Sequence, residues 1–179
     1  MYDAIIVGAG PAGSSAAFHC NKLGLKTLLL DKSSFPRDKV CGDALSGKSV
    51  KLLDEMRLLD GLNKLDGAII NRIIFGNPNH SECELHLNKR LNKRHISHGY
   101  VIPRKSFDNY LFSAASKGSD VKSDFHVTDL IFNNEKVVGV EGKFSNGEAK
   151  NYYGYVFLGA DGPYSIVARK TGSYNSDNN

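Results

Sequence analysis

The fold of this chain is decided by residues 3–31, which read DAIIVGAGPAGSSAAFHCNKLGLKTLLLD. The run Asp3–Val7 is apolar and rich in β-branched residues, as expected for a buried parallel strand. Residues Ser14–Leu23 favour a helix, and Gly24 follows as a helix-ending residue. A second apolar run, Thr27–Leu30, predicts another buried strand. The order strand, turn, helix, strand predicts a right-handed βαβ unit.

Three glycines stand between the first strand and the helix at the spacing Gly-x-Gly-x-x-Gly, and Asp31 follows the last of them by eighteen positions. Gly8 permits the tight turn, Gly10 lets a pyrophosphate approach the backbone, and Gly13 lets the helix pack against the strand. The helix N-terminus would present free N–H groups and partial positive charge to the phosphates. A carboxylate at Asp31 can accept hydrogen bonds from a ribose diol and repels a 2′-phosphate, which favours NAD or FAD over NADP. The alternative is a glycine-rich turn that binds nothing.

The composition is that of an ordinary globular protein. Of the 179 residues, 41% are hydrophobic and 23% are charged, and the formal net charge is +4. These values exclude disordered and fibrous classes, and the length suits about one domain. The charge is too small and too dispersed for a dedicated nucleic-acid binder. One basic cluster is present, for which a solvated loop is favoured over a phosphate or lipid-headgroup contact. It consists of Lys89, Arg90, Lys93, Arg94 and His95.

Cysteine and histidine usage argues against disulfides and metals. The cysteines Cys20, Cys41 and Cys83 are too widely spaced for a disulfide framework or a metal-binding pair. The histidines in the middle of the chain fit no compact zinc spacing and are predicted to be exposed. They are His80, His86, His95 and His98. No metal is therefore predicted. Because neither a signal peptide nor an apolar run of about 18 residues is found, we expect a cytoplasmic protein.

Beyond the βαβ unit the pattern becomes mostly β. A loop is predicted over Lys32–Leu45, Ser46 is placed to cap a helix, and another helix is predicted over Arg104–Lys117. Turns at residues 133–135 and 146–147 indicate hairpins, and a short helical segment ends at Arg169. The predicted strands are Ile69–Phe75, Cys83–Leu87, Tyr100–Ile102, Val121–Phe132, Val137–Phe144 and Tyr152–Leu158.

Four segments together resemble the N-terminal half of the geranylgeranyl reductase family of flavoproteins. They are the glycine-rich turn with Asp31, then FPRDKVCGDA at residues 35–44, YVIPRKSFD at 100–108 and GADGPYSIVAR at 159–169. The Pro-Arg…Cys-Gly-Asp stretch favours the reductase branch. The other segments are shared with a wider class that includes aromatic hydroxylases and flavin-dependent halogenases. The resemblance covers nearly the whole chain and implies that the dinucleotide is FAD.

The resemblance also implies roles for individual residues. Cys41, Gly42 and Ala44 would lie along the FAD toward its isoalloxazine ring. Arg104 would contact the phosphate or ribitol region, which suits a guanidinium fork. Val127 would contact the adenine end through its backbone, and the pair Asp161-Gly162 would lie near the pyrophosphate. The full predicted cofactor-binding set is Gly8, Gly10, Ala12, Gly13, Asp31, Lys32, Cys41, Gly42, Ala44, Arg104, Val127, Asp161 and Gly162.

Each of these assignments has a plainer alternative. Cys41 is favoured as part of the cofactor wall, and direct thiol chemistry is the weaker interpretation because a reactive thiol needs a lowered pKa. Arg104 could be a surface residue at a helix start, and Asp161-Gly162 an ordinary turn or helix cap. No catalytic acid or base can be assigned from the sequence. Asp38 and Asp43 are the acidic residues nearest the predicted flavin loop.

The predicted fold class is α/β: a Rossmann-like FAD-binding βαβ domain with an inserted or attached β-rich segment, forming an incomplete flavoprotein fold. Residues 1–172 would be the N-terminal part of the FAD-binding domain, with about 69–103 beginning a substrate-facing β segment, and 173–179 a polar tail. The chain therefore resembles the first part of a longer flavoenzyme.

The resemblance implies reduction of isoprenoid C=C bonds by hydride transfer from reduced flavin. The expected partners are an isoprenoid or other apolar substrate, a reduced nicotinamide or another electron donor, and a membrane surface met peripherally. Two alternatives stay open: a flavin-dependent monooxygenase or halogenase, and a cofactor-binding fragment without turnover.

Overall fold

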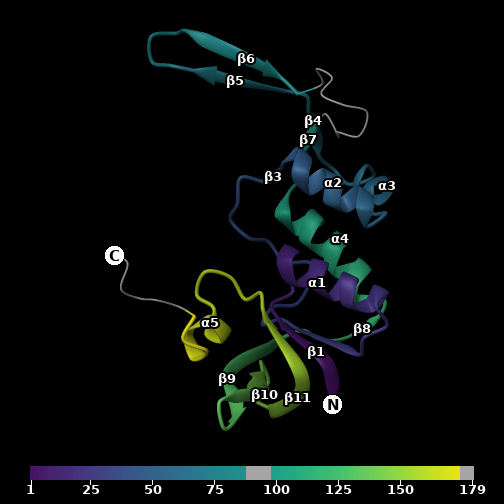
Figure 1. Cartoon of the computed structure of the whole chain (residues 1–179). Coiled ribbons are helices and arrows are strands. Elements are labelled where there is room, and N and C mark those ends of the chain that lie inside the picture. Colours follow the sequence, from purple (N-terminus) through teal and green to yellow (C-terminus); the bar gives the residue numbers. More distant parts are fainter. Residues whose placement is uncertain (88–97, 174–179) are drawn as a thin grey trace. The chain divides into compact units, whose positions relative to one another are not determined.

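The computed structural model describes residues 1–87 and 98–173, so the basic cluster at 89–95 and most of the predicted polar tail lie outside the described residues. The chain divides into two compact units (Figure 1). Unit 1 consists of Met1–Arg37 and Asp108–Asn179, and unit 2 of Asp38–Phe107. Helix α4 (Arg104–Ser116) contains the boundary, because unit 1 resumes at Asp108.

Unit 1 is built on one six-stranded sheet in the order β8-β2-β1-β11-β10-β9. The first four of these strands are parallel, and β9 and β10 complete an antiparallel meander with β11. Helix α1 connects β1 to β2, which confirms the predicted βαβ unit and α/β class. The elements of unit 1 are β1 (Tyr2–Val7), α1 (Pro11–Lys22), β2 (Thr27–Leu30), β8 (Ser119–Lys122), β9 (Phe125–Asn133), β10 (Lys136–Phe144), β11 (Ala149–Gly159) and α5 (Ile166–Lys170).

Successive residues of the central strands point to opposite faces of the sheet and so pack into two separate cores. Ile6 and Leu29 pack on one face with Ala17 of α1 and Ala115 of α4. On the opposite face, Ile5, Val7, Leu28 and Leu30 pack against side chains of the meander and α5. Both faces of β1 and β2 are therefore buried, which explains why these strands read as continuous apolar runs.

The prediction of one strand over Val121–Phe132 is wrong, because the chain turns at Ser123-Asp124 and forms β8 and β9 instead. Asp124 adopts a left-handed backbone conformation, with φ of +56°. The two strands form opposite edges of one sheet although only two residues separate them, so the sheet has to curl. The backbone N–H of Phe125 accordingly donates to the Asp31 carbonyl at the end of β2, at 2.9 Å.

Unit 2 contains a small antiparallel sheet in the order β3-β7-β4, with helix α2 against β3, β7 and α3. Ser46 caps α2 as predicted, because its hydroxyl accepts from the Ser49 N–H. The buried apolar residues of the unit include Val50, Leu53, Leu62 and Ile102. The elements are β3 (Ala44–Leu45), α2 (Gly47–Glu55), α3 (Leu59–Leu62), β4 (Ala68–Ile70), β5 (Arg72–Gly76), β6 (Glu82–His86) and β7 (Gly99–Val101).

Among the described residues, strands β5 and β6 pair only with each other and form a two-stranded hairpin (Figure 1). The predicted strand Ile69–Phe75 is wrong as a single element, since it breaks at Asn71 into β4 and β5, which belong to different sheets. Every residue of the hairpin strands is exposed. Its register places Ile73 opposite Leu85 and Phe75 opposite Cys83, so one face of the hairpin is apolar.

Among residues 1–87 and 98–173, no helix has both the length and the apolar character needed to cross a bilayer.

Candidate functional site

The glycine-rich turn lies in unit 1, where β1 meets α1. The Gly8 N–H donates to the Leu30 carbonyl at 2.8 Å, and the Ala160 N–H donates to the Val7 carbonyl at 2.7 Å. The turn is therefore fixed on both sides by the strands that neighbour β1. Within the turn, the Ser14 hydroxyl donates to the Ala9 carbonyl at 2.8 Å.

The three glycines of the turn are surrounded in different ways. Gly8 has φ of +98°, and a Cβ there would lie 2.4 Å from the Ala160 carbonyl oxygen. A Cβ on Gly13 would lie 1.7 Å from the Gly8 carbonyl oxygen, so the close approach of α1 to β1 requires glycine. At Gly10 the nearest atom to such a Cβ is Nη2 of Arg37, at 3.4 Å. The backbone at Gly10 is thus open to a ligand where the other two glycines are closed by the protein.

The start of α1 follows directly on the glycine-rich turn. The helix begins at Pro11 after Gly10, no side chain caps it, and its first turn contains no acidic residue. Ala12 in this turn is exposed. Free N–H groups and the helix dipole at such an end favour a bound anion. The chemistry of the turn therefore fits the pyrophosphate of a dinucleotide.

Asp31 lies at the carboxyl end of β2 and supports the same turn. Its side chain is buried, and its carboxylate accepts hydrogen bonds from the Ala9 N–H at 2.7 Å and the Ser33 N–H at 2.9 Å. The carboxylate is thus oriented by the backbone before any ligand arrives. Each carboxylate oxygen can accept more than one hydrogen bond, so capacity for a ribose diol is left.

Lys32 and Val127 lie near this strand end but in different settings. Lys32 is exposed and lines an open pocket of about 370 Å³ with Asp124, His126 and Lys143. Val127 is buried in β9 and packs in the same core as Leu28 and Leu30 of β2. Its predicted contact with adenine, through the backbone, stays a prediction.

The Asp161-Gly162 segment follows β11 and adjoins the glycine-rich turn through Ala160. The Asp161 carboxylate accepts hydrogen bonds from the Ser165 hydroxyl at 2.5 Å and the Ile166 N–H at 2.7 Å. Asp161 thus binds the first N–H of α5, a helix whose N-cap is Ser165. Its predicted contact with the cofactor stays a prediction. Gly162 has φ of +86°, a conformation that favours glycine.

The remaining predicted residues lie in unit 2, where Cys41, Asp43 and Arg104 form a cluster. The pKa of the exposed Cys41 thiol lies below its ordinary value, first because of a hydrogen bond from the Asp43 backbone and second because of the Arg104 side chain. The Asp43 carboxylate accepts from the Arg104 N–H at 3.3 Å. Gly42 and Ala44 are exposed, and nothing lies within 4 Å of a Cβ built on Gly42.

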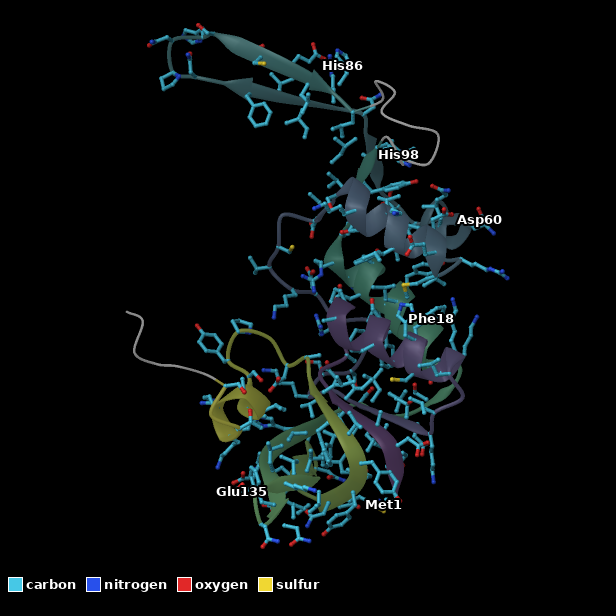
Figure 2. The ribbon with its side chains drawn as sticks, in the orientation of Figure 1. Met1, Phe18, Asp60, His86, His98 and Glu135 are labelled. Atoms are coloured by element: carbon cyan, nitrogen blue, oxygen red, sulfur yellow. The ribbon has the colours of Figure 1, made fainter. Side chains whose placement is uncertain are left out.

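Figure 2 shows His86 on β6 and His98 just before β7. The described part of the chain contains no group of three or more His, Cys, Asp or Glu side chains that could hold a metal ion. His80 and His86 are exposed, His98 is half-buried, and His95 lies outside the described residues.

Sequence reasoning missed one charged pair beside the glycine-rich turn. Arg37 Nη1 lies 3.1 Å from the Asp108 carboxylate oxygen Oδ2, and Asp108 is fully buried. The two residues lie far apart in the chain, and the pairing arises only because the loop after β2 meets α4. Both residues lie in segments that carry the family resemblance, Arg37 in 35–44 and Asp108 in 100–108, but nothing in the sequence indicated that they pair.

The curled parallel sheet, the glycine-rich turn and the oriented carboxylate at the end of β2 define a dinucleotide-binding α/β protein. A family model described as FAD binding domain matches residues 1–177. The chain belongs to this FAD binding domain family. This membership confirms FAD as the cofactor, which the turn alone could not distinguish from NAD.

Individual relatives agree with the predicted resemblance. The chain is 32% identical over 179 residues to digeranylgeranylglycerophospholipid reductase 2 of Methanothermobacter thermautotrophicus, across 96% of this chain. A geranylgeranyl bacteriochlorophyll reductase-like protein from Thermoplasma acidophilum has a TM-score of 0.71 at 30% identity, over 87% of this chain and 38% of that one. A flavin-dependent brominase has a TM-score of 0.81 at 27% identity, over 94% of this chain and 40% of that one. The chain spans 42% of the length of the Methanothermobacter reductase.

Proposed function

We propose that this chain is part of an FAD-dependent oxidoreductase that reduces carbon–carbon double bonds of an isoprenoid chain. The observation that carries the proposal is the combination of 32% identity to a digeranylgeranylglycerophospholipid reductase with the FPRDKVCGDA stretch at residues 35–44. When bound, reduced FAD supplies the hydride for such a reduction. The protein's own part is to hold and orient the cofactor.

Unit 1 contributes the elements that suit the nucleotide half of FAD. The start of α1 and the open backbone at Gly10 suit the pyrophosphate, and the Asp31 carboxylate suits the adenosine ribose. In unit 2, Cys41 and Arg104 are proposed to contact the cofactor, with Gly42 and Ala44 beside them. Arg104 and the Asp43 backbone stabilise the anionic form of the Cys41 thiol.

The proposed partners follow from the same reaction. An apolar isoprenoid substrate, a reduced nicotinamide or another electron donor, and peripheral contact with a membrane surface belong to this proposal. The support is the lipid substrate in the name of the Methanothermobacter reductase.

A second candidate is a flavin-dependent monooxygenase or halogenase, in which reduced flavin would react with oxygen. The likeness to a flavin-dependent brominase, at a TM-score of 0.81 and 27% identity, favours it. The resemblance of the Pro-Arg…Cys-Gly-Asp stretch to the reductase branch favours the first candidate.

The test is a comparison of two assays on the FAD-loaded protein. With chemically reduced flavin and no oxygen, the proposed reductase adds two hydrogens to a double bond of a geranylgeranyl lipid, detected by mass spectrometry. A halogenase or monooxygenase instead consumes oxygen with reduced flavin and modifies an aromatic substrate. If the protein binds FAD but performs neither reaction, it acts as a cofactor-binding module and the proposed activity is rejected.

A further inference from the structure

We propose that Arg37 binds the pyrophosphate of FAD directly and that Asp108 is the residue that positions it. The inference rests on the FAD binding shown by the family, and it does not depend on which reaction the flavin performs. All the residues that carry it belong to unit 1.

The guanidinium of Arg37 faces the one open glycine of the phosphate-binding turn. Its Nη2 lies 3.4 Å from the position that a Cβ on Gly10 would take, whereas backbone atoms face Gly8 and Gly13. Gly10 is the residue immediately before α1, where the free N–H groups of the helix are presented. An anion held by the helix N-terminus at Gly10 would therefore lie within reach of this guanidinium.

The Arg37 side chain is held in place from two directions. Asp108 in α4 is fully buried and lies 3.1 Å from Nη1, while the Arg37 side chain is only 18% exposed. The guanidinium also lies over the ring of Phe35, at 4.9 Å from its centroid. Phe35 in turn stacks on Phe112 of α4, with centroids 4.1 Å apart and planes within 7°. An arginine fixed in this way loses little rotational freedom when it binds a phosphate.

The helix N-terminus and the Arg37 guanidinium together favour binding of an anion. A cation beside a helix N-terminus is unfavourable, and the first turn of α1 has no acidic residue to offset it. Asp108 pairs with Nη1 at 3.1 Å and compensates the charge on that side, while Nη2 faces Gly10. Phosphate oxygens match the arginine fork, so Nη2 can bind an anion at Gly10 while Nη1 stays paired with Asp108. A pyrophosphate at Gly10 would satisfy both the helix end and the guanidinium.

The test measures nucleotide affinity rather than turnover. Binding of FAD is followed by flavin fluorescence, and binding of ADP and adenosine by calorimetry, for the whole chain and its variants. We expect Arg37→Met to weaken FAD and ADP by about tenfold or more, as expected for a lost charge-assisted hydrogen bond. Adenosine, which lacks the pyrophosphate, should bind Arg37→Met and wild type equally. Arg37→Lys keeps the positive charge but loses the forked guanidinium, so its affinity for FAD and ADP should lie between those of wild type and Arg37→Met.

The matched control is Arg72→Met. Arg72 also pairs with a carboxylate, Glu84, at 2.9 Å, but on the exposed hairpin. The two variants lose the same charge and a similar ion pair. Arg72→Met should leave all three affinities unchanged, so a general effect of net charge would be recognised.

The role of Asp108 is tested by a double-mutant cycle. Asp108→Asn should weaken FAD several-fold, because Arg37 loses its anchor. In the Arg37→Met background the same substitution should have no further effect on FAD, since a positioning residue acts only through the residue it positions. Thermal unfolding of each variant separates this result from a loss of folded protein, and Arg37→Lys carries the test if Arg37→Met does not fold.

Three outcomes would overturn the proposal in distinguishable ways. If folded Arg37→Met and Arg37→Lys bind FAD and ADP as wild type does, the pair is purely structural. If Arg37→Met weakens the binding of adenosine as much as the binding of ADP, Arg37 does not act on the pyrophosphate. If the wild-type chain binds no FAD, the cofactor-binding premise fails along with the role of Arg37. Loss of reductase activity with FAD affinity intact would concern only the proposed function.

Discussion

The central strands of unit 1 and the β5–β6 hairpin of unit 2 are made of similar residues in different surroundings. Ile5 and Ile6 in β1 have no exposed surface, whereas Ile73 and Ile74 in β5 are 38% and 50% exposed. A two-stranded hairpin is marginal without further packing, while β1 is covered on both faces and paired on both edges. The glycine-rich turn and Asp31, which suit the nucleotide, therefore lie at the ends of strands whose conformation is fixed by packing on both faces. The hairpin lies in the segment predicted to begin the substrate side, and in the described part of the chain its strands pair with no other strand.

The largest difference is expected when one methyl group is added at each of two glycines, one in each unit. Gly13→Ala places a Cβ 1.7 Å from the Gly8 carbonyl oxygen, which forces α1 away from β1. We expect the free energy of unfolding to fall by about 3 kcal/mol or more and FAD binding to be lost. Gly42→Ala in unit 2 meets nothing within 4 Å and should leave unfolding unchanged. Urea denaturation measures both, and equal effects would show that the turn is no better determined than the loop of unit 2.

The second test uses one substitution in two strands. Ile5→Ala removes a fully buried side chain from the core and should cost about 2–4 kcal/mol of unfolding free energy. Ile73→Ala on the hairpin should cost no more than about 1 kcal/mol, because its side chain is already partly in water. Chemical denaturation compares the two. A loss at Ile73 as large as that at Ile5 would mean that the hairpin face is covered in solution.

Two aspartates give a third, smaller contrast. Asp31→Ala removes the acceptor of two backbone hydrogen bonds at 2.7 and 2.9 Å, and we expect a cost of about 2 kcal/mol together with weaker FAD binding. Asp43→Ala removes an acceptor at 3.3 Å in a half-buried position and should cost less than about 1 kcal/mol. Thermal unfolding and an FAD titration check both. The contrast breaks if Asp43 proves the more costly of the two to remove.

The smallest expected effect concerns thiol reactivity in unit 2. Because the thiolate is the reacting form and the pKa of Cys41 is lowered, its alkylation by iodoacetamide should begin at lower pH than for an ordinary thiol. Arg104→Met should move the pH profile of Cys41 back upward and reduce its rate several-fold near neutral pH. Mass spectrometry resolves the sites, with exposed Cys83 as the internal reference. A profile that Arg104→Met leaves in place would remove Arg104 as a cause.

The sequence predicted the parts of the fold that local rules govern. The strands β1 and β2, the cap at Ser46 and the helix end at Gly24 follow from apolar runs, side-chain capping and a left-handed glycine with φ of +72°. The break between β8 and β9 was missed because an aspartate, Asp124, takes the left-handed conformation there. No glycine or proline marked the turn.

The candidate site was predictable to the same degree. The glycine-rich turn and Asp31 are adjacent in sequence to the elements that orient them, so their geometry could be anticipated. The Arg37–Asp108 pair could not, because it depends on the loop after β2 meeting α4 in the folded chain. Asp161 accepts hydrogen bonds from Ser165 and Ile166 at the start of α5, and both partners lie within five residues of it in the chain.

The contact between Gly8 and Ala160 has a consequence for the order of biosynthesis. The first βα turn closes only when the Ala160 N–H reaches the Val7 carbonyl and β11 has paired with β1. On the ribosome, β1 emerges before β11, and it gains its second neighbouring strand only after residues 149–159 have left the exit tunnel. Such long-range closure is slow compared with local helix formation. We therefore expect the nascent chain to capture its nucleotide late, after most of this stretch has been translated.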